Sequence, residues 1–127
     1  MSDVISNPKW MTWTGRVLST LPVLMICMGL VMLAMHPEMT KEMSKYGYPE
    51  GAGKAILPVE VACVVLYLIP QTAVFGAILL TAYFGGAVAT HVIGREVFAA
   101  PIIVCAVFWF GLYFREPRLR AIVFWRQ

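Results

Sequence analysis

Glu60 lies inside a long apolar stretch of the sequence, and His91 lies at the end of another. A charged carboxylate at the centre of a bilayer costs roughly 2.5–3.5 kcal/mol even on lenient scales, so such a residue is a candidate for function. Glu60 can keep its proton there, or lose it and pair with an imidazolium. The two residues therefore suggest either a proton-handling or ligand-anchoring site, or a hydrogen bond that locks helices together and contributes about 0.6–2 kcal/mol.

Further polar side chains follow Glu60 at helical spacing. Cys63 comes one helical turn later and Tyr67 two turns later, so a helix would place all three on one face. Thr81, Tyr83 and Thr90 add hydroxyls to the next apolar stretch. These groups either bond helices together or line a cavity for a lipid-soluble ligand. The candidates for ligand binding or proton handling are Glu60, His91, Tyr67 and Thr81.

The sequence holds no nucleotide-binding loop, catalytic serine motif or cluster of metal ligands. We therefore assign no catalytic residues and no metal site, and no cofactor is evident. Two histidines, His36 and His91, lie at the ends of apolar stretches on the same side of the expected membrane, but His36 is next to Pro37 in a loop. Since cofactor sites in bundles use side chains on facing helices, we do not expect haem. The cysteines each fall in an apolar run with no C-x-x-C pair, which predicts buried thiols (Cys27, Cys63 and Cys105).

The composition is that of a membrane protein. Of the 127 residues, 60% are hydrophobic and 13% are charged, against about 45–50% and 25% in soluble domains. The net charge of +3 is divided between two ends and a loop, whereas nucleic-acid binding needs a clustered basic face. Membrane lipid is therefore the expected partner, and nucleic acid is not.

Four apolar runs predict four membrane-spanning helices, at about residues 17–35, 55–69, 72–92 and 97–114. Residues 1–16 form an interfacial tail before this four-helix domain (17–114), and residues 115–127 form a basic, aromatic tail after it. Pro70-Gln71 leaves room only for an antiparallel hairpin, which could bring Glu60 and His91 to a similar depth. The expected fold is an all-α, up-down-up-down integral membrane bundle. In the loop, Thr40–Tyr46 is either a short interfacial helix that ends at Gly47 or a solvated connector.

Small and basic residues predict packing and orientation. Gly76, Gly85 and Gly86 leave little side chain on the 72–92 helix, so we expect helix packing there. Six Lys or Arg lie on the side of the termini and four on the opposite side, which favours cytoplasmic termini in a bacterial inner membrane. The residues expected at the membrane interface are Trp10, Trp13, Arg115, Arg118 and Trp125.

Two stretches resemble a known family: VEVACVVLYLIPQTAVFGAILLTAYFGGAVATHV from Val59 and FGLYFREPRLRAI from Phe110. They are similar to the DoxX-like family of small bacterial four-helix membrane proteins, over about Thr14 to Ile122. The name-giving relatives are associated with membrane quinone redox chemistry, which the resemblance implies for this chain. The matching positions are Glu60, Tyr67, Pro70, Gly76, Thr81, Gly85, Gly86, His91, Trp109, Tyr113, Arg115 and Arg118.

One departure from the family weakens a catalytic interpretation. The family pattern in the first helix is similar to D-G-x-x-K. At the corresponding positions this chain has Met28-Gly29-Leu30-Val31-Met32 and so lacks both charges. We therefore expect a small non-catalytic membrane subunit or ligand-binding module, related to quinone. The alternative is a structural subunit that docks onto a larger membrane complex. Other membrane subunits or a second copy of the chain are the protein partners that these two hypotheses consider.

Overall fold

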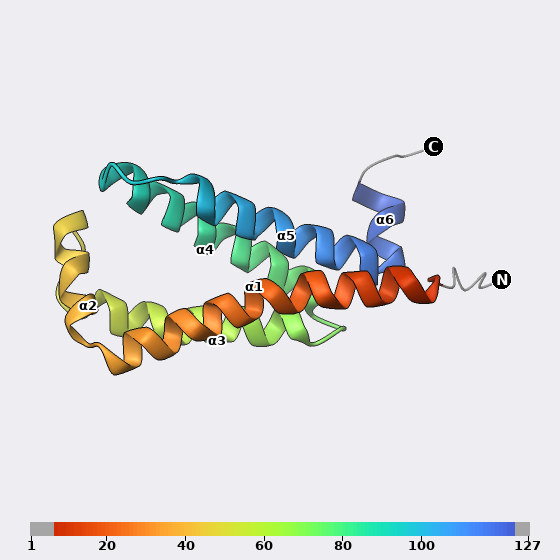
Figure 1. Cartoon of the computed structure of the whole chain (residues 1–127), viewed down its shortest axis with the longest axis horizontal. Coiled ribbons are helices and arrows are strands. Elements are labelled where there is room, and N and C mark those ends of the chain that lie inside the picture. The colour runs from red at the N-terminus through yellow and green to blue at the C-terminus, as the bar shows by residue number, and fades with distance from the viewer. Residues whose placement is uncertain (1–6, 124–127) are drawn as a thin grey trace.

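The computed structural model describes residues 7–123, and in that range every regular element is a helix. Four long helices carry the fold (Figure 1). Trp125, one of the expected interface residues, lies outside the described residues. The elements in chain order are α1 (Lys9–Met35), α2 (Glu38–Glu42), the 3-10 helix η1 (Met43–Tyr46), α3 (Ala52–Leu68), α4 (Ala73–Ile93), α5 (Ala99–Arg115) and α6 (Pro117–Val123).

Helix α1 begins at Lys9, eight residues before the expected start at residue 17. The expected boundary followed the change from polar to apolar residues. Backbone hydrogen bonding does not depend on that change, and the helix starts directly after Pro8. Residues 9–16, the second half of the expected interfacial tail, are therefore the first two turns of a helix. At the other end of the chain, residues 117–123 of the expected C-terminal tail form helix α6.

The segment of residues 37–51 is largely helical, as one of the two interpretations of this loop proposed. Helix α2 passes directly into η1, and Gly47 ends η1 in the left-handed conformation, with φ of 82°. Gly51, which directly precedes α3, is also in the left-handed conformation, with φ of 85°. Glycine adopts such angles without the steric cost that a Cβ atom adds. The segment can therefore fold back on itself beside the long helices.

Neighbouring long helices are α1 with α5, α5 with α4, and α4 with α3. Helices α1 and α5 approach closely because small residues meet there. A Cβ atom on Gly15 would lie 2.7 Å from the backbone nitrogen of Arg115, and one on Gly111 would lie 2.8 Å from that of Ser19. Such crossings allow backbones to pack with little side chain between them.

Tyr67 joins all four long helices. Its side chain is fully buried, and its hydroxyl oxygen lies 2.9 Å from both Ser19 Oγ in α1 and the Phe108 carbonyl oxygen in α5. Its ring meets the Phe108 ring edge-on at 4.8 Å. In α4, a Cβ atom on Gly76 would lie 2.6 Å from Tyr67 Cα. The centre of the fold is therefore one aromatic residue held by contacts from three neighbouring helices.

Helices α3 and α4 lie close together at their connecting turn and apart at their other ends (Figure 1). The Gly76–Tyr67 contact holds the turn end together. At the open end, the 37–51 segment lies between the helices, and Tyr48 in this segment hydrogen-bonds to Thr90 in α4. The hairpin is thus wedge-shaped, and its wide end is where a pocket forms.

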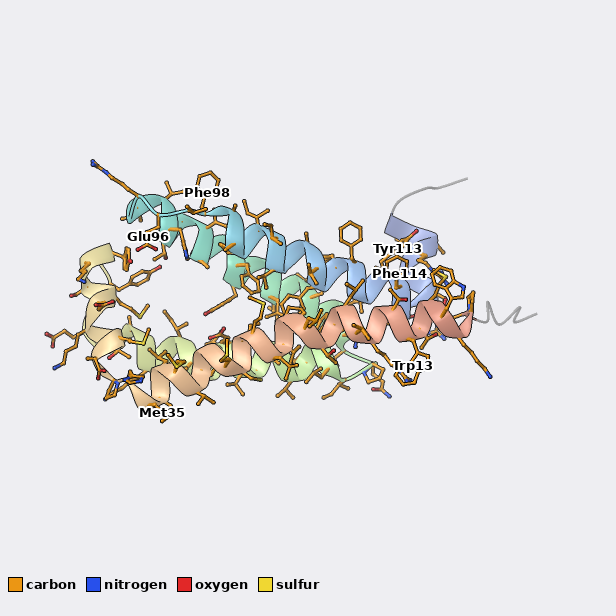
Figure 2. The ribbon with its side chains drawn as sticks, viewed as in Figure 1. Trp13, Met35, Glu96, Phe98, Tyr113 and Phe114 are labelled. Atoms are coloured by element: carbon orange, nitrogen blue, oxygen red, sulfur yellow. The ribbon has the colours of Figure 1, made fainter. Side chains whose placement is uncertain are left out.

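Two helices, α1 and α4, are long and apolar enough to cross a membrane, and α5 is a shorter apolar helix. Large apolar side chains also cover the outside of the long helices, where Figure 2 shows them pointing away from the centre. Leu24 and Met28 on α1 and Ile103 on α5 are each more than 60% exposed. Exposed apolar surface on this scale is typical of a protein that meets lipid or a partner.

Candidate functional site

Glu60 faces Tyr83 of α4, not His91. The Glu60 carboxyl group and the Tyr83 hydroxyl interact across the α3–α4 hairpin. The register of the hairpin explains this pairing, because the tight contact is between Tyr67 and Gly76. Counting seven residues back along α3 and seven forward along α4 places Glu60 opposite Tyr83.

The expectation that Glu60 and His91 share a depth is therefore wrong. His91 lies eight residues beyond Tyr83, which is about 12 Å along a helix. Within residues 7–123, no hydrogen bond or ion pair links the two side chains. The expectation counted from the apparent ends of the apolar runs, whereas the close glycine contact near the turn sets the register.

His91 belongs to a cluster at the open end of the hairpin. Its Nδ1 lies 2.8 Å from the carbonyl oxygen of Ala87, and its Nε2 lies 4.0 Å from a carboxylate oxygen of Glu96. The other carboxylate oxygen of Glu96 accepts a hydrogen bond of 2.6 Å from the Tyr46 hydroxyl. Glu96 therefore connects the end of α4 with the 37–51 segment.

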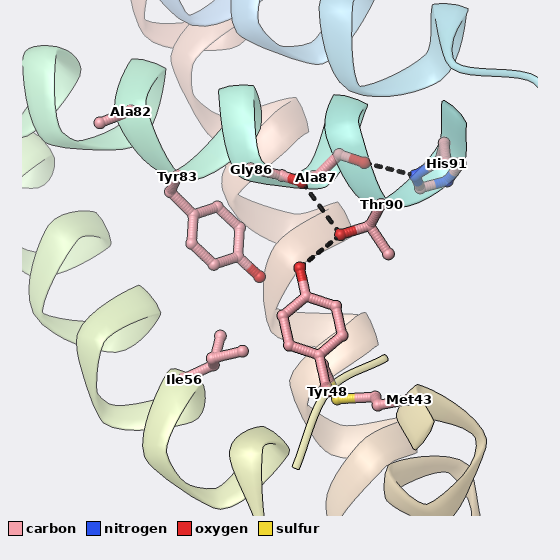
Figure 3. A pocket seen from close by; sticks show the side chains of 9 residues that line it. All are labelled: Met43, Tyr48, Ile56, Ala82, Tyr83, Gly86, Ala87, Thr90 and His91. Atoms are coloured by element: carbon pink, nitrogen blue, oxygen red, sulfur yellow. Dashed lines mark hydrogen bonds between the residues drawn. The ribbon is translucent and has the colours of Figure 1, made fainter. Parts of the chain in front are cut away.

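A pocket of about 370 Å³ lies between α3, α4 and the 37–51 segment. Figure 3 shows the Tyr83 side chain extending from α4 toward α3, with Tyr48 beside it. Thr90 Oγ1 lies 3.0 Å from the Gly86 carbonyl oxygen, to which it donates, and 2.6 Å from the Tyr48 hydroxyl, which then donates to it. The lining residues are Met43, Tyr48, Ile56, Ala82, Tyr83, Gly86, Ala87, Thr90 and His91.

The pocket wall is thin at Gly86. A Cβ atom built there would meet nothing within 4 Å, so the space beside this backbone is open. Most of the remaining wall is apolar, and the hydroxyls of Tyr48 and Thr90 meet beside that of Tyr83 (Figure 3). Small-molecule sites usually combine an apolar wall with a few well-placed polar groups. The arrangement can hold an apolar ring and hydrogen-bond a polar substituent on it.

The hydrogen bond from Tyr46 to Glu96 should be visible in a pH titration. This bond is the main cause that raises the pKa of Tyr46 above its ordinary value of 10.0, because the carboxylate stabilises the protonated phenol. The contact is fully present below pH 10 and is lost as the pH rises through the higher pKa of the folded protein. Absorbance at 295 nm, taken as the difference between the wild type and Tyr46→Phe, should give a midpoint above 10. Glu96→Gln should return it toward 10, whereas Glu50→Gln should leave it unchanged; equal shifts in both variants would contradict the assignment.

The other predicted site residues lie elsewhere. Tyr67 is in the core, and Thr81 lies at the α4–α5 side, where it accepts a hydrogen bond of 2.8 Å from Trp109 Nε1. The four candidates therefore do not form one site. Tyr48 and Tyr83 line the pocket. Neither is among the four candidates, although Tyr83 is one of the hydroxyls that the sequence suggests for a cavity. Equal spacing about the Tyr67–Gly76 contact could have identified Tyr83, whereas no sequence signal places Tyr48.

The packing glycines also separate into two kinds. Gly76 packs against the backbone of α3, but a Cβ atom on Gly85 or Gly86 would meet nothing within 4 Å. Within residues 7–123, Gly85 and Gly86 therefore do not pack against another helix, because α4 turns that stretch toward two open pockets. The expectation of packing applies only to Gly76.

The four predicted interface residues that the structure describes lie at the end of the molecule that holds the start of α1. Trp10 and Trp13 are exposed, at 63% and 65%. Arg118 is also exposed. Arg115 instead points inward, where its Nη2 donates a hydrogen bond of 2.6 Å to the Tyr67 carbonyl oxygen and its guanidinium carbon lies 4.5 Å from the Tyr67 ring centre. Arg115 is thus a core contact, because its long side chain reaches the Tyr67 ring.

A family model described as the DoxX-like family matches residues 17–111. This match confirms the resemblance found in the sequence. It covers most of the chain, from the third turn of α1 to near the end of α5. No curated protein and no solved structure matches the chain.

Proposed function

The chain belongs to the DoxX-like family, and from this premise we propose that it is a multi-pass membrane protein that binds a lipid-soluble ligand. The spanning unit would be an up-down four-helix bundle of α1, α3, α4 and α5 in the bacterial inner membrane, with both termini cytoplasmic. The length and composition of α1 and α4 support this arrangement, as do the apolar side chains on the outside of all four helices. The protein would act as a small non-catalytic subunit or binding module.

The pocket at the wide end of the α3–α4 hairpin is the observation that carries this proposal. Its apolar wall suits a ligand drawn from the bilayer, and Tyr83 offers a hydroxyl to an acceptor on that ligand. In this proposal Glu60 keeps its proton and donates it from α3 to the Tyr83 oxygen, so that the hydroxyl proton of Tyr83 is free for the ligand. A quinone head group combines an apolar ring with carbonyl acceptors, and it therefore fits these groups.

Filling the pocket tests this function. Gly86→Leu should extend into the open space and lower the affinity for a short-tailed benzoquinone at least tenfold, measured by equilibrium binding to the purified protein in detergent. Gly29→Leu is the matched control, because Gly29 is a helical glycine of α1 with nothing within 4 Å and lies outside the pocket. Tyr83→Phe should also weaken binding, since it removes the donor. An absence of saturable binding in the wild type, or an equal loss in Gly29→Leu, would overturn the proposal.

The second candidate is a structural subunit, which the groove between α4 and α5 favours. This groove encloses about 380 Å³ beside Gly85 and carries no covering helix within residues 7–123. Gly85→Leu should then abolish co-purification with a larger membrane assembly, while Gly29→Leu should not. A solitary monomer extracted from native membranes would contradict this candidate.

A further inference from the structure

The two ends of the molecule differ in charge. Among residues 7–123, five basic residues and one acidic residue lie at the end formed by the start of α1, the end of α5 and α6. The opposite end, with the 37–51 segment and the α4–α5 connection, carries four basic and four acidic residues and is balanced. The residues of the charged end are Lys9, Arg16, Arg115, Arg118, Arg120 and Glu116; those of the balanced end are Lys41, Lys45, Lys54, Arg95, Glu38, Glu42, Glu50 and Glu96.

Two of the five basic side chains at the charged end are used within the fold. Arg115 donates to the Tyr67 carbonyl oxygen, and Arg120 hydrogen-bonds to Asn7 Oδ1. The other three, Lys9, Arg16 and Arg118, are exposed. Within residues 7–123, none of these three forms an ion pair with an acidic side chain. Their exposure makes them accessible to an anion from outside the chain.

Two of these cations and an aromatic ring share one face of α1. Lys9, Trp13 and Arg16 follow each other at spacings of four and three residues, which places them in one stripe on a helix. The Arg16 guanidinium carbon lies 5.9 Å from the Trp13 ring centre. Tryptophan prefers the head-group level of a membrane, and Arg and Lys bind phosphate oxygens. The stripe combines both properties on a surface that is exposed within residues 7–123.

We propose that this stripe, together with Arg118, binds the head groups of anionic phospholipids. The occupant is a lipid because Trp13 needs an apolar interface beside the phosphate and the neighbouring Trp10 is exposed in the same way. The balanced end of the molecule would have no such preference. This inference rests on the charged end alone and is independent of the pocket and its ligand.

Lipid selectivity at Trp13 tests the proposal. The full chain is reconstituted in equimolar phosphatidylglycerol and phosphatidylcholine with bromine on one lipid or the other, and quenching of Trp13 is taken as the difference between the wild type and Trp13→Phe. We expect about a fivefold preference for phosphatidylglycerol, the effect of roughly one basic residue at an anionic surface. The preference should disappear in 1 M salt, where the screening length is about 3 Å.

Two triple variants show whether the preference belongs to this end. Lys9→Gln with Arg16→Gln and Arg118→Gln should remove it, while Lys41→Gln with Lys45→Gln and Lys54→Gln should preserve it. Both sets change only exposed side chains, so helical circular dichroism should match the wild type in each. Equal quenching by the two lipids in the wild type would overturn the proposal and would favour an acidic protein as the occupant. A preference that survives the first triple variant, or one that the second removes, would also overturn it.

Discussion

Replacing Gly76 by alanine is expected to lower the free energy of unfolding by about 3 kcal/mol or more, at the upper end of what overpacking costs. The added Cβ atom would lie 2.6 Å from Tyr67 Cα and 2.7 Å from the Leu66 carbonyl carbon. Both are backbone atoms of α3, so no side chain can rotate away to make room. Helices α3 and α4 would have to separate, and Tyr67 would move with α3 from its contacts in α1 and α5.

Unfolding by SDS in mixed micelles, followed by circular dichroism, measures this effect. Gly29→Ala is the control, since a Cβ atom there meets nothing within 4 Å. It should be neutral or more stable by about 0.5–1 kcal/mol, the usual gain from replacing a helical glycine. If Gly76→Ala unfolds at the same SDS fraction as Gly29→Ala, then the close helix contact does not set the register of the hairpin.

The sequence predicted the long helices well because their signal is local. Each apolar run lies within a long helix or nearly coincides with one, and the observed bounds differ mainly where polar residues continue a helix, as at Lys9. The register between helices was not predictable in the same way. It depends on how closely two backbones approach at Gly76, and that distance reflects which face of α3 meets which face of α4.

Only part of the candidate site is predictable from the sequence, because the pocket depends on contacts between segments that are far apart in the chain. The cost of a carboxylate in an apolar stretch singles out Glu60 as a residue that needs a partner, and in the structure Glu60 interacts with Tyr83. The pocket itself depends on the 37–51 segment, which contributes Met43 and Tyr48 from outside the apolar runs. Its position follows from contacts with residues far along the chain, such as that between Tyr46 and Glu96. Hydrophobic patterning carries no information about such contacts.

The contact between Gly76 and Tyr67 links the core to the pocket. Because Gly76 and Tyr67 hold α3 and α4 together near their turn, the helices separate toward the other end, where the pocket opens beside Gly86 (Figures 1 and 3). A change that loosens the core should therefore alter the pocket, whereas a change in the pocket wall should leave the core intact. Gly86→Leu is accordingly expected to keep the stability of the wild type while it loses ligand.

Tyr67→Ala is expected to lower the free energy of unfolding by about 3–5 kcal/mol, as removal of a fully buried aromatic ring usually does. The ring is enclosed by α1, α4 and α5, and its edge-on contact with Phe108 would be lost with it. Tyr67→Phe separates the hydroxyl from the ring. This substitution should lower the free energy of unfolding by about 1–2 kcal/mol, because Ser19 Oγ loses a buried hydrogen-bond partner. The Phe108 carbonyl oxygen loses the same hydroxyl but lies inside α5, where it can still accept a backbone hydrogen bond.

Phe75→Ala provides the matched control, since it removes an aromatic ring of the same size from the exposed side of α4. It should change stability by no more than about 0.5 kcal/mol. The double variant Tyr67→Phe with Ser19→Ala should be less destabilised than the sum of the two single variants, because both remove the same hydrogen bond. Strict additivity would show that the hydroxyls do not interact. A Tyr67→Ala protein as stable as Phe75→Ala would mean that the four long helices are held together elsewhere than at Tyr67.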